Sequence, residues 1–213
     1  MTDAEEGVTK FDLAFTPAAP LPDAPLAVLN AWRSILWRLG LIGQDPARYG
    51  GVGFGNVSQR LKSASALRFV ISGTQTGALA ALDARHYAVV SACHPARNRV
   101  DAEGPIAPSS ESLTHGMLYR VDPAIRFIFH VHSSDIWSAP ALDLPRTADR
   151  IAYGTPAMAR EMARLWRRGA LARQRVLIMG GHTDGVIAFG RTAEQAGMAL
   201  LRALVAASAR LRP

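Results

Sequence analysis

The chain has 213 residues, of which 49% are hydrophobic, and a single cysteine, Cys93. A chain of this length can bury more than half of its unfolded surface in one domain, and one cysteine cannot form an intrachain disulfide, which is typical of a reducing, cytoplasmic compartment. The net charge of +7 comes from scattered arginines, and the apolar stretches are too short or too broken to span a membrane, so we expect neither nucleic acid nor a membrane as partner.

The N-terminal segment and the first helix can be expected from prolines and from apolar spacing. Residues 1–25 contain four prolines, which predicts an extended arm ahead of a domain over residues 26–213. Apolar residues then recur at helical spacing from Leu26 to Leu39, which predicts a helix that ends near Gly40. After a glycine-rich segment, short strands are expected over residues 57–60, 67–72 and 87–91.

The second half of the chain gives clearer signals. A helix is expected from Ser110 to about Val121, and residues 126–132 indicate a strand in which apolar residues alternate with a set that contains His130 and His132. The remaining elements are a helix from Thr155-Pro156 to about Trp166, two buried strands at 176–179 and 186–189, and a last helix that begins with a capping box at Thr192–Gln195. Strands that alternate with helices indicate a layered α/β domain, although periodicity cannot fix the strand order.

Three histidines and one glutamate are candidates for a metal site. His130 and His132 are two residues apart on the predicted strand, so their rings project from the same face. His182 lies in a Gly-rich connection between two buried strands, and Glu111 lies at the start of a predicted helix. Three imidazoles and a carboxylate suit Zn²⁺ or a similar ion. Two surface histidines would show the same spacing, however, and the helix dipole alone would favour a glutamate at that position.

The order of five short motifs favours the metal site over these alternatives. Together they resemble the class II aldolase/adducin family over about residues 26–210, and the motifs are Phe54-Gly55-Asn56-Val57-Ser58, Ile71-Ser72-Gly73-Thr74-Gln75-Thr76-Gly77, Pro108-Ser109-Ser110-Glu111, Phe129-His130-Val131-His132-Ser133 and Gly181-His182-Thr183-Asp184-Gly185. The resemblance implies a three-layer α/β/α fold with a central mixed, largely antiparallel sheet. It also implies a homotetramer.

The resemblance further implies roles for individual residues. Glu111, His130, His132 and His182 would hold one divalent cation, most simply Zn²⁺, with Mn²⁺, Co²⁺ or Fe²⁺ as alternatives. His182 is followed here by Thr-Asp-Gly where many members have glycine at once, an apparent insertion of two residues. The substrate phosphate would be bound by Asn56, Ser58, Thr74, Thr76, Gly77, Ser109 and Ser110. Amides, hydroxyls and backbone N–H groups at a helix start bind anions, so a carboxylate could use the same cradle, and Asn56 with Ser58 could instead cap a turn.

Two kinds of proton-transfer group are expected. Glu111 is the candidate general base or acid, and either Tyr153 or Asp149 would protonate the leaving aldehyde, in the way that family aldolases use a tyrosine across a subunit boundary. His115 shares the helix face of Glu111 and is expected to form hydrogen bonds rather than to bind the metal.

The expected function is a metal-dependent aldolase, a carbon–carbon lyase that cleaves a small ketose phosphate or hydroxy-carbonyl compound through an enediolate. The same enediolate would also serve an epimerase, a dehydratase or a decarboxylase. Two other classes stay open: a non-catalytic adducin-like binding domain, which typically lacks the ligand residues, and a non-haem iron oxygenase.

Overall fold

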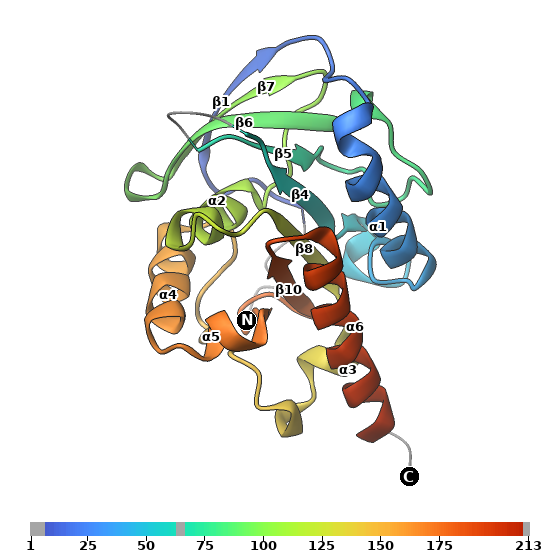
Figure 1. Ribbon diagram of the computed structural model, residues 1–213, viewed down its shortest axis with the longest axis vertical. Coiled ribbons are helices and arrows are strands. Elements are labelled where there is room, and N and C mark those ends of the chain that lie inside the picture. Colours follow the sequence, from blue (N-terminus) through green and yellow to red (C-terminus); the bar gives the residue numbers. More distant parts are fainter. Residues whose placement is uncertain (1–6, 63–66, 211–213) are drawn as a thin grey trace.

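The computed structural model describes residues 7–62 and 67–210, and its centre is one eight-stranded sheet (Figure 1). The strands lie in the order β1-β7-β6-β5-β4-β8-β10-β9. Their bounds are β1 Asp12–Pro17, β4 Asn56–Arg60, β5 Phe69–Ser72, β6 Tyr87–His94, β7 Arg99–Gly104, β8 Phe127–His132, β9 Val176–Ile178 and β10 Gly185–Gly190. Every neighbouring pair is antiparallel except β1 with β7. The expected mixed, largely antiparallel sheet is therefore confirmed.

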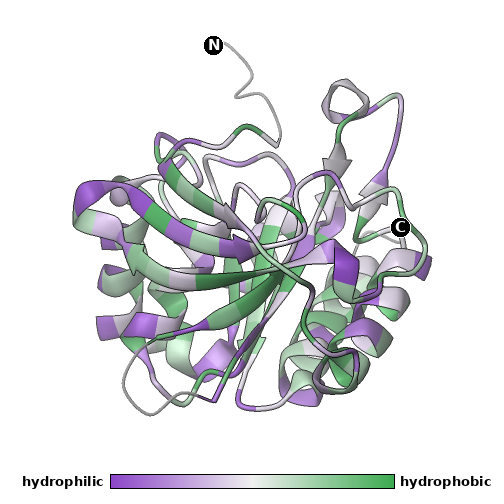
Figure 2. Ribbon diagram, turned by 90° about the horizontal axis from the view of Figure 1, so that it is seen from above, coloured by the Kyte–Doolittle hydropathy of each residue, from purple (hydrophilic) through white to green (hydrophobic). Residues whose placement is uncertain are grey.

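Helices cover both faces of this sheet, which gives three layers (Figures 1 and 2). The helices are α1 Ala27–Arg38, α2 Ser112–Val121, α3 Ser134–Trp137, α4 Pro156–Arg167, α5 Ala170–Gln174 and α6 Ala193–Arg210. Helices α1, α3 and α6 pack apolar side chains against one face of the sheet, and these residues form a first cluster. Helices α2, α4 and α5 pack against the other face and form a second cluster. Neither the sheet nor an amphipathic helix can be stable with its apolar side in water, so the layers depend on one another.

Strand β8 lies between β4 and β10 and shows how the sequence pattern positions the site. Phe129 and Val131 belong to the first cluster and Ile128 to the second. This alternation is the one expected from the sequence, and it places His130 on the same face as Ile128. Full burial of a side chain such as Phe129 contributes roughly 2–3 kcal/mol. A slip of one residue would exchange these two faces, so the apolar residues fix where the histidines point.

The N-terminal segment takes part in the sheet. Within the arm predicted over residues 1–25, Asp12–Pro17 form β1, which pairs in parallel with β7 (Arg99–Gly104) at the sheet edge. The sequence analysis predicted neither strand. It also missed a small two-stranded sheet of β2 (Gly43–Gln44) and β3 (Gly53–Phe54). The domain boundary at residue 26 stays a prediction.

The last helix, α6 Ala193–Arg210, begins at the predicted cap residue Thr192, but the Gln195 side chain accepts from the residue before the cap rather than from the cap itself. The backbone N–H of Gln195 donates to Thr192 Oγ1 at 3.1 Å, and the Gln195 side-chain oxygen accepts from the backbone N–H of Arg191 at 3.1 Å. No helix within residues 7–62 and 67–210 combines the length and the apolar character needed to cross a membrane.

We expect Thr192→Ala to lower the free energy of unfolding by about 1 kcal/mol, because it leaves a backbone donor of α6 without its side-chain acceptor. Thr192→Ser keeps the hydroxyl and should lose less. Urea unfolding of the three proteins measures the difference. Equal loss in both variants would mean that the methyl group, rather than the cap, matters at this position.

Candidate metal centre

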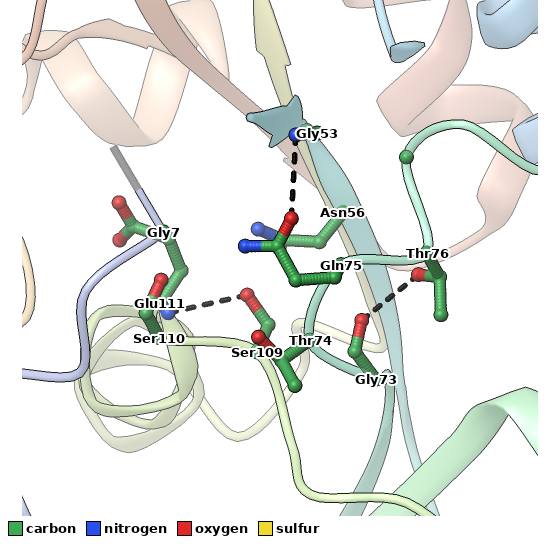
Figure 3. Close-up of a pocket in the computed structure, with 12 residues that line it drawn as sticks. Gly7, Gly53, Asn56, Gly73, Thr74, Gln75, Thr76, Ser109, Ser110 and Glu111 are labelled. Atoms are coloured by element: carbon green, nitrogen blue, oxygen red, sulfur yellow. Dashed lines mark hydrogen bonds between the residues drawn. The ribbon is translucent and has the colours of Figure 1, made fainter. Parts of the chain in front are cut away.

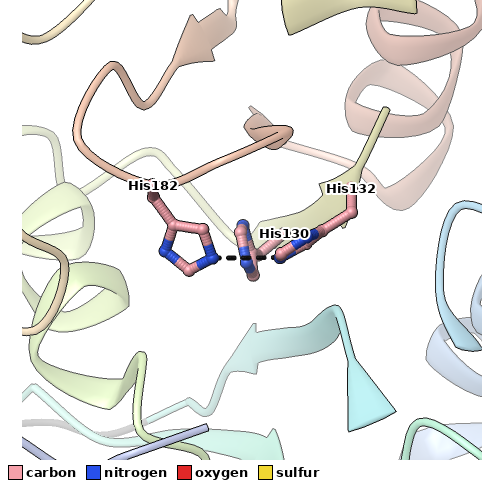
Figure 4. A group of neighbouring side chains, drawn as sticks. All are labelled: His130, His132 and His182. Atoms are coloured by element: carbon pink, nitrogen blue, oxygen red, sulfur yellow. Dashed lines mark hydrogen bonds between the residues drawn. The ribbon is translucent and has the colours of Figure 1, made fainter. Parts of the chain in front are cut away.

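Three buried histidines meet at the end of β8 (Figure 4). His130 and His132 come from β8 itself, and His182 comes from the connection between β9 and β10. One ring nitrogen of each lies within 4.8 Å of the others, and His182 Nε2 lies 3.0 Å from His132 Nε2. These separations bracket the value of about 3.4 Å that follows from zinc–nitrogen bonds in a tetrahedral site. The reading of these residues as exposed surface histidines is therefore wrong.

Glu111 lies beside the three histidines. It directly precedes α2, where it makes no side-chain hydrogen bond that caps the helix. Its Oε1 instead lies 3.2 Å from His182 Nδ1, and both side chains are buried. A carboxylate at one ring nitrogen fixes the orientation of the imidazole and leaves the other nitrogen for a cation. The role of Glu111 as a direct ligand stays a prediction.

The electrostatics of the centre suit a cation. Burial, with the neighbouring His182 and His130, lowers the pKa of His132 well below its usual value, so the ring is neutral at pH 7 and can act as a ligand. Burial opposes ionisation of Glu111, but its contact with His182 and the proximity of His130 outweigh this and lower its pKa to about 2. A neutral His132 imidazole and an ionised Glu111 carboxylate, together with two further histidines, form a donor set that fits Zn²⁺ or a similar divalent ion.

A polar cradle (Figure 3) includes Glu111, the residue that contacts His182. Its wall is formed by two loops and the residues before α2, and it includes Gly55, Asn56, Gly73, Thr74, Gln75, Thr76, Gly77, Ser109, Ser110 and Glu111. Asn56 Oδ1 is buried and has no hydrogen-bond partner among the described residues, so this side chain retains unused polar capacity for a ligand. The cradle brings together all the expected anion-binding residues except Ser58.

Glycine is required in the cradle where the loops approach each other. A Cβ built on Gly77 would lie 2.4 Å from the carbonyl oxygen of Gly43 and 2.8 Å from the backbone nitrogen of Phe54. Thr76 Oγ1 donates to the carbonyl of Gly73 at 2.8 Å. This hydroxyl therefore holds the loop in its turn, and its proton is already used within the loop.

Ser58, which was expected in the cradle, has a different place. It is fully buried one pleat beyond Asn56, where its Oγ lies 2.7 Å from His115 Nδ1 and 2.8 Å from the Tyr119 hydroxyl. The side chain thus joins β4 to α2 in a buried hydrogen-bond network. The same contact gives His115 the hydrogen-bonding position expected for it, outside the group of possible metal ligands.

The two expected proton donors lie in different surroundings. The Asp149 side chain is 77% exposed and forms an ion pair with Arg146. Tyr153 is buried, and its ring centroid lies 4.5 Å from that of His182. Its hydroxyl is engaged by the backbone of Val8, accepting from the N–H at 3.1 Å and donating to the carbonyl at 3.2 Å. The ring thus borders the centre, while the hydroxyl holds the N-terminal segment.

Sequence reasoning missed Arg33, which supports the cradle from α1. This side chain is 2% exposed and donates to the carbonyls of Thr76 and Gly77 at 2.9 and 3.2 Å, and also to that of Leu79. Burial lowers its pKa from the ordinary arginine value. A signal was present in the sequence, because Arg33 lies in the same helical stripe as the apolar Leu29 and Leu36.

The second missed group lies next to His132. The Tyr49 ring centroid is 4.6 Å from that of His132, and the Tyr49 hydroxyl bonds Asp184 Oδ2 at 2.6 Å. Arg48 pairs with the same carboxylate at 3.0 Å. Asp184 belongs to the Thr-Asp insertion noted after His182, which was the available signal in the sequence.

Comparisons with known proteins agree with this geometry. The sequence profile described as Class II Aldolase and Adducin N-terminal domain matches residues 47–209. No curated protein matches the chain in sequence.

Solved structures show the same fold. They include L-fuculose-1-phosphate aldolase from Thermus thermophilus, with a TM-score of 0.61 and 20% identity over 87% of this chain and 91% of that one. YgbL from Escherichia coli, a putative aldolase/epimerase/decarboxylase, has a TM-score of 0.64 and 15% identity over 88% of each chain. A sugar-phosphate aldolase from Thermotoga maritima has a TM-score of 0.62 and 14% identity over 90% of this chain and 99% of that one.

The likeness in structure establishes the fold, and the profile covers more than half of the sequence. The chain therefore belongs to the class II aldolase/adducin family.

Proposed function

We propose that this protein is a metal-dependent carbon–carbon lyase that acts on a small phosphorylated ketose or hydroxy-carbonyl compound. The observation that carries the proposal is the position of Glu111, which both lines the anion cradle and contacts His182. One carboxylate thus lies between a site suited to a phosphate and a site suited to a divalent cation. A substrate that binds in both would have its reacting carbon beside the only acid among the described residues of the cradle wall.

The residues divide the chemical work between them. His130, His132 and His182 would hold the cation, which supplies Lewis-acid polarisation of the substrate carbonyl worth several kcal/mol of charge stabilisation. The cradle would fix the phosphate end of the substrate and so orient the bond to be broken. Glu111 would move a proton at the carbon next to the carbonyl. Because its pKa is lowered to about 2, the Glu111 carboxylate is ionised at pH 7 and would accept the proton in the condensation direction.

Three features support a lyase over the other classes. The three histidines of the ligand set are present and converge, whereas a binding domain has no need of them. The cradle favours an anionic substrate, which a three-histidine oxygenase site does not require. Sugar-phosphate aldolases are among the structural relatives. Epimerase, dehydratase and decarboxylase activities would use the same residues, and product analysis with sugar phosphates and sugar-acid phosphates separates them.

The first test is a change at Glu111. With dihydroxyacetone phosphate and a small aldehyde as substrates, Glu111→Gln should lower kcat about 10²- to 10⁴-fold, because the variant loses the proton-transfer group. Its metal content should fall far less. His132→Ala should lose both turnover and metal, measured by elemental analysis of the purified protein.

Glu103→Gln is the matched control, because Glu103 forms an ion pair with Arg68 at a distant part of the sheet. It should behave like the parent protein. Full activity in Glu111→Gln would show that this residue does not transfer the proton. Absence of any bound metal in the parent protein would contradict the proposed lyase activity.

The second test concerns the cradle. Arg33→Met removes the donors to three loop carbonyls and should cost about 1–3 kcal/mol in stability. Inorganic phosphate should raise the Tm of the parent protein, and this shift should shrink in Arg33→Met because the loop around Thr76 and Gly77 loses its support.

Arg38→Met, on the exposed side of the same helix, is the control and should keep the full phosphate effect. Arg33→Lys, which restores a charge but only part of the bonding, should fall between the two. If phosphate does not raise the Tm of the parent protein, the cradle does not bind the anion, and if it stabilises Arg33→Met as much as the parent, Arg33 does not support anion binding.

A further inference from the structure

The turn before β3 is built to hold one aromatic side chain in place. Arg48 N–H donates to Asp45 O at 3.0 Å and Gly51 N–H to Arg48 O at 2.9 Å. Tyr49 has φ 51°, in the left-handed region, and Gly50 and Gly51 follow with φ 64° and 75°. A tyrosine in this region is strained by about 1–3 kcal/mol and persists only where its surroundings require it.

The Tyr49 side chain extends from this turn to the metal centre. Its ring meets His132 edge to face, with centroids 4.6 Å apart, and meets Phe54 with centroids 5.2 Å apart. Contacts of this geometry are attractive by about 0.5–1.5 kcal/mol. The ring is only partly exposed. Tyr49 therefore packs against the outer side of the imidazole.

Asp184 links the hydroxyl of this tyrosine to the rest of the centre. Its Oδ2 accepts from Tyr49 at 2.6 Å and from Arg48 at 3.0 Å, and its backbone carbonyl accepts from the N–H of Ser133 at 2.8 Å. Ser133 directly follows His132, and Asp184 comes two residues after His182. One aspartate thus joins the end of β8, the His182 loop and the Tyr49 turn.

The backbone of Asp184 is also unusual, with φ 60°. A strained tyrosine and an aspartate in the left-handed region, which aspartate tolerates, therefore meet through a hydrogen bond of 2.6 Å. An ordinary surface ion pair contributes about 0–1 kcal/mol and would not need the strained Tyr49. Burial of the Asp184 side chain, which is 15% exposed, also distinguishes this contact from a surface pair.

We propose that Arg48, Tyr49 and Asp184 form an outer clamp that positions His132 and His182 for ligation of the cation. This inference rests on the proposed metal-dependent function. In the clamp, the Tyr49 ring limits rotation of the His132 imidazole, and Asp184 fixes the loop that carries His182. None of the three is a catalytic residue. They act through the ligands, and partners of this kind change metal affinity about 10- to 100-fold when they are removed.

The test is a double-mutant cycle read out by metal binding. Tyr49→Phe keeps the ring but removes the bond to Asp184, and Asp184→Asn weakens the same bond from the other side. Each should raise the Kd for Co²⁺ about 10- to 100-fold and change the visible ligand-field bands of the bound ion. Because both changes affect the Tyr49–Asp184 bond, and Asp184→Asn also alters the pair with Arg48, the loss in the double variant should be smaller than the sum of the two single losses.

Matched controls are available away from the centre. Tyr87→Phe removes a hydroxyl that bonds Asn30 at 2.6 Å, and Asp101→Asn alters an ion pair with Arg99. Both should bind Co²⁺ as the parent protein does. Arg48→Gln gives an independent third variant of the clamp. Near-UV circular dichroism before metal addition checks that each protein is folded.

The outcomes separate the two proposals. If the parent protein binds neither Co²⁺ nor Zn²⁺, both the proposed lyase activity and the proposed clamp are contradicted. If the parent binds Co²⁺, but Tyr49→Phe, Asp184→Asn and Arg48→Gln all keep its Kd and its spectrum, the clamp is overturned while the lyase stands. Additive losses in the cycle would also overturn it, because they would show that Tyr49 and Asp184 act separately.

Discussion

The structure depends on the burial of three imidazoles and one carboxylate at the end of β8. Burying polar groups in a protein interior costs free energy unless they are bonded or bind an ion. Here the contact of Glu111 with His182 Nδ1 and the contact between the Nε2 atoms of His132 and His182 offset part of that cost. A stable fold does not require a buried cluster of three imidazoles and a carboxylate. The presence of this cluster in the core is therefore the strongest argument that it has a chemical role.

The same elements that bury the candidate metal ligands also form part of the polar cradle. Asn56 lies opposite His130 in the pairing of β4 with β8, so the amide of the cradle and a ligand of the centre are neighbours in the sheet. Residues 109–111 bring two serines and Glu111 to the start of α2. Strand register and helix position therefore set the spacing of Asn56, His130 and Glu111, whereas His182 and residues 73–77 come from loops. Rigid spacing of this kind suits a substrate held at both ends.

Local sequence patterns predicted those parts of the protein that depend on local rules. The alternation in residues 126–132 gave β8 and the face of its histidines, and the Thr192 capping box gave the start of α6. Strand β1 was missed because none of its residues is fully buried and the nearby prolines indicated an extended arm, although Leu13 and Phe15 do alternate and pack against the second cluster. The motif order indicated the cradle, but it placed Ser58 there, and only packing against α2 shows that this hydroxyl bonds His115 and Tyr119.

Contacts between residues far apart in the sequence could not be predicted, because no local pattern encodes them. Tyr49 and Asp184 are 135 residues apart, and neither turn predicts a partner for the other. Arg33 lies where helical spacing alone predicts an apolar residue, and its role becomes clear only when the loop carbonyls of residues 76–79 are seen around it. In both cases the local conformation or burial is unfavourable by itself, and the distant contact compensates for it. Departures from local rules thus occur beside the two binding sites, where geometry matters more than the stability of any single element.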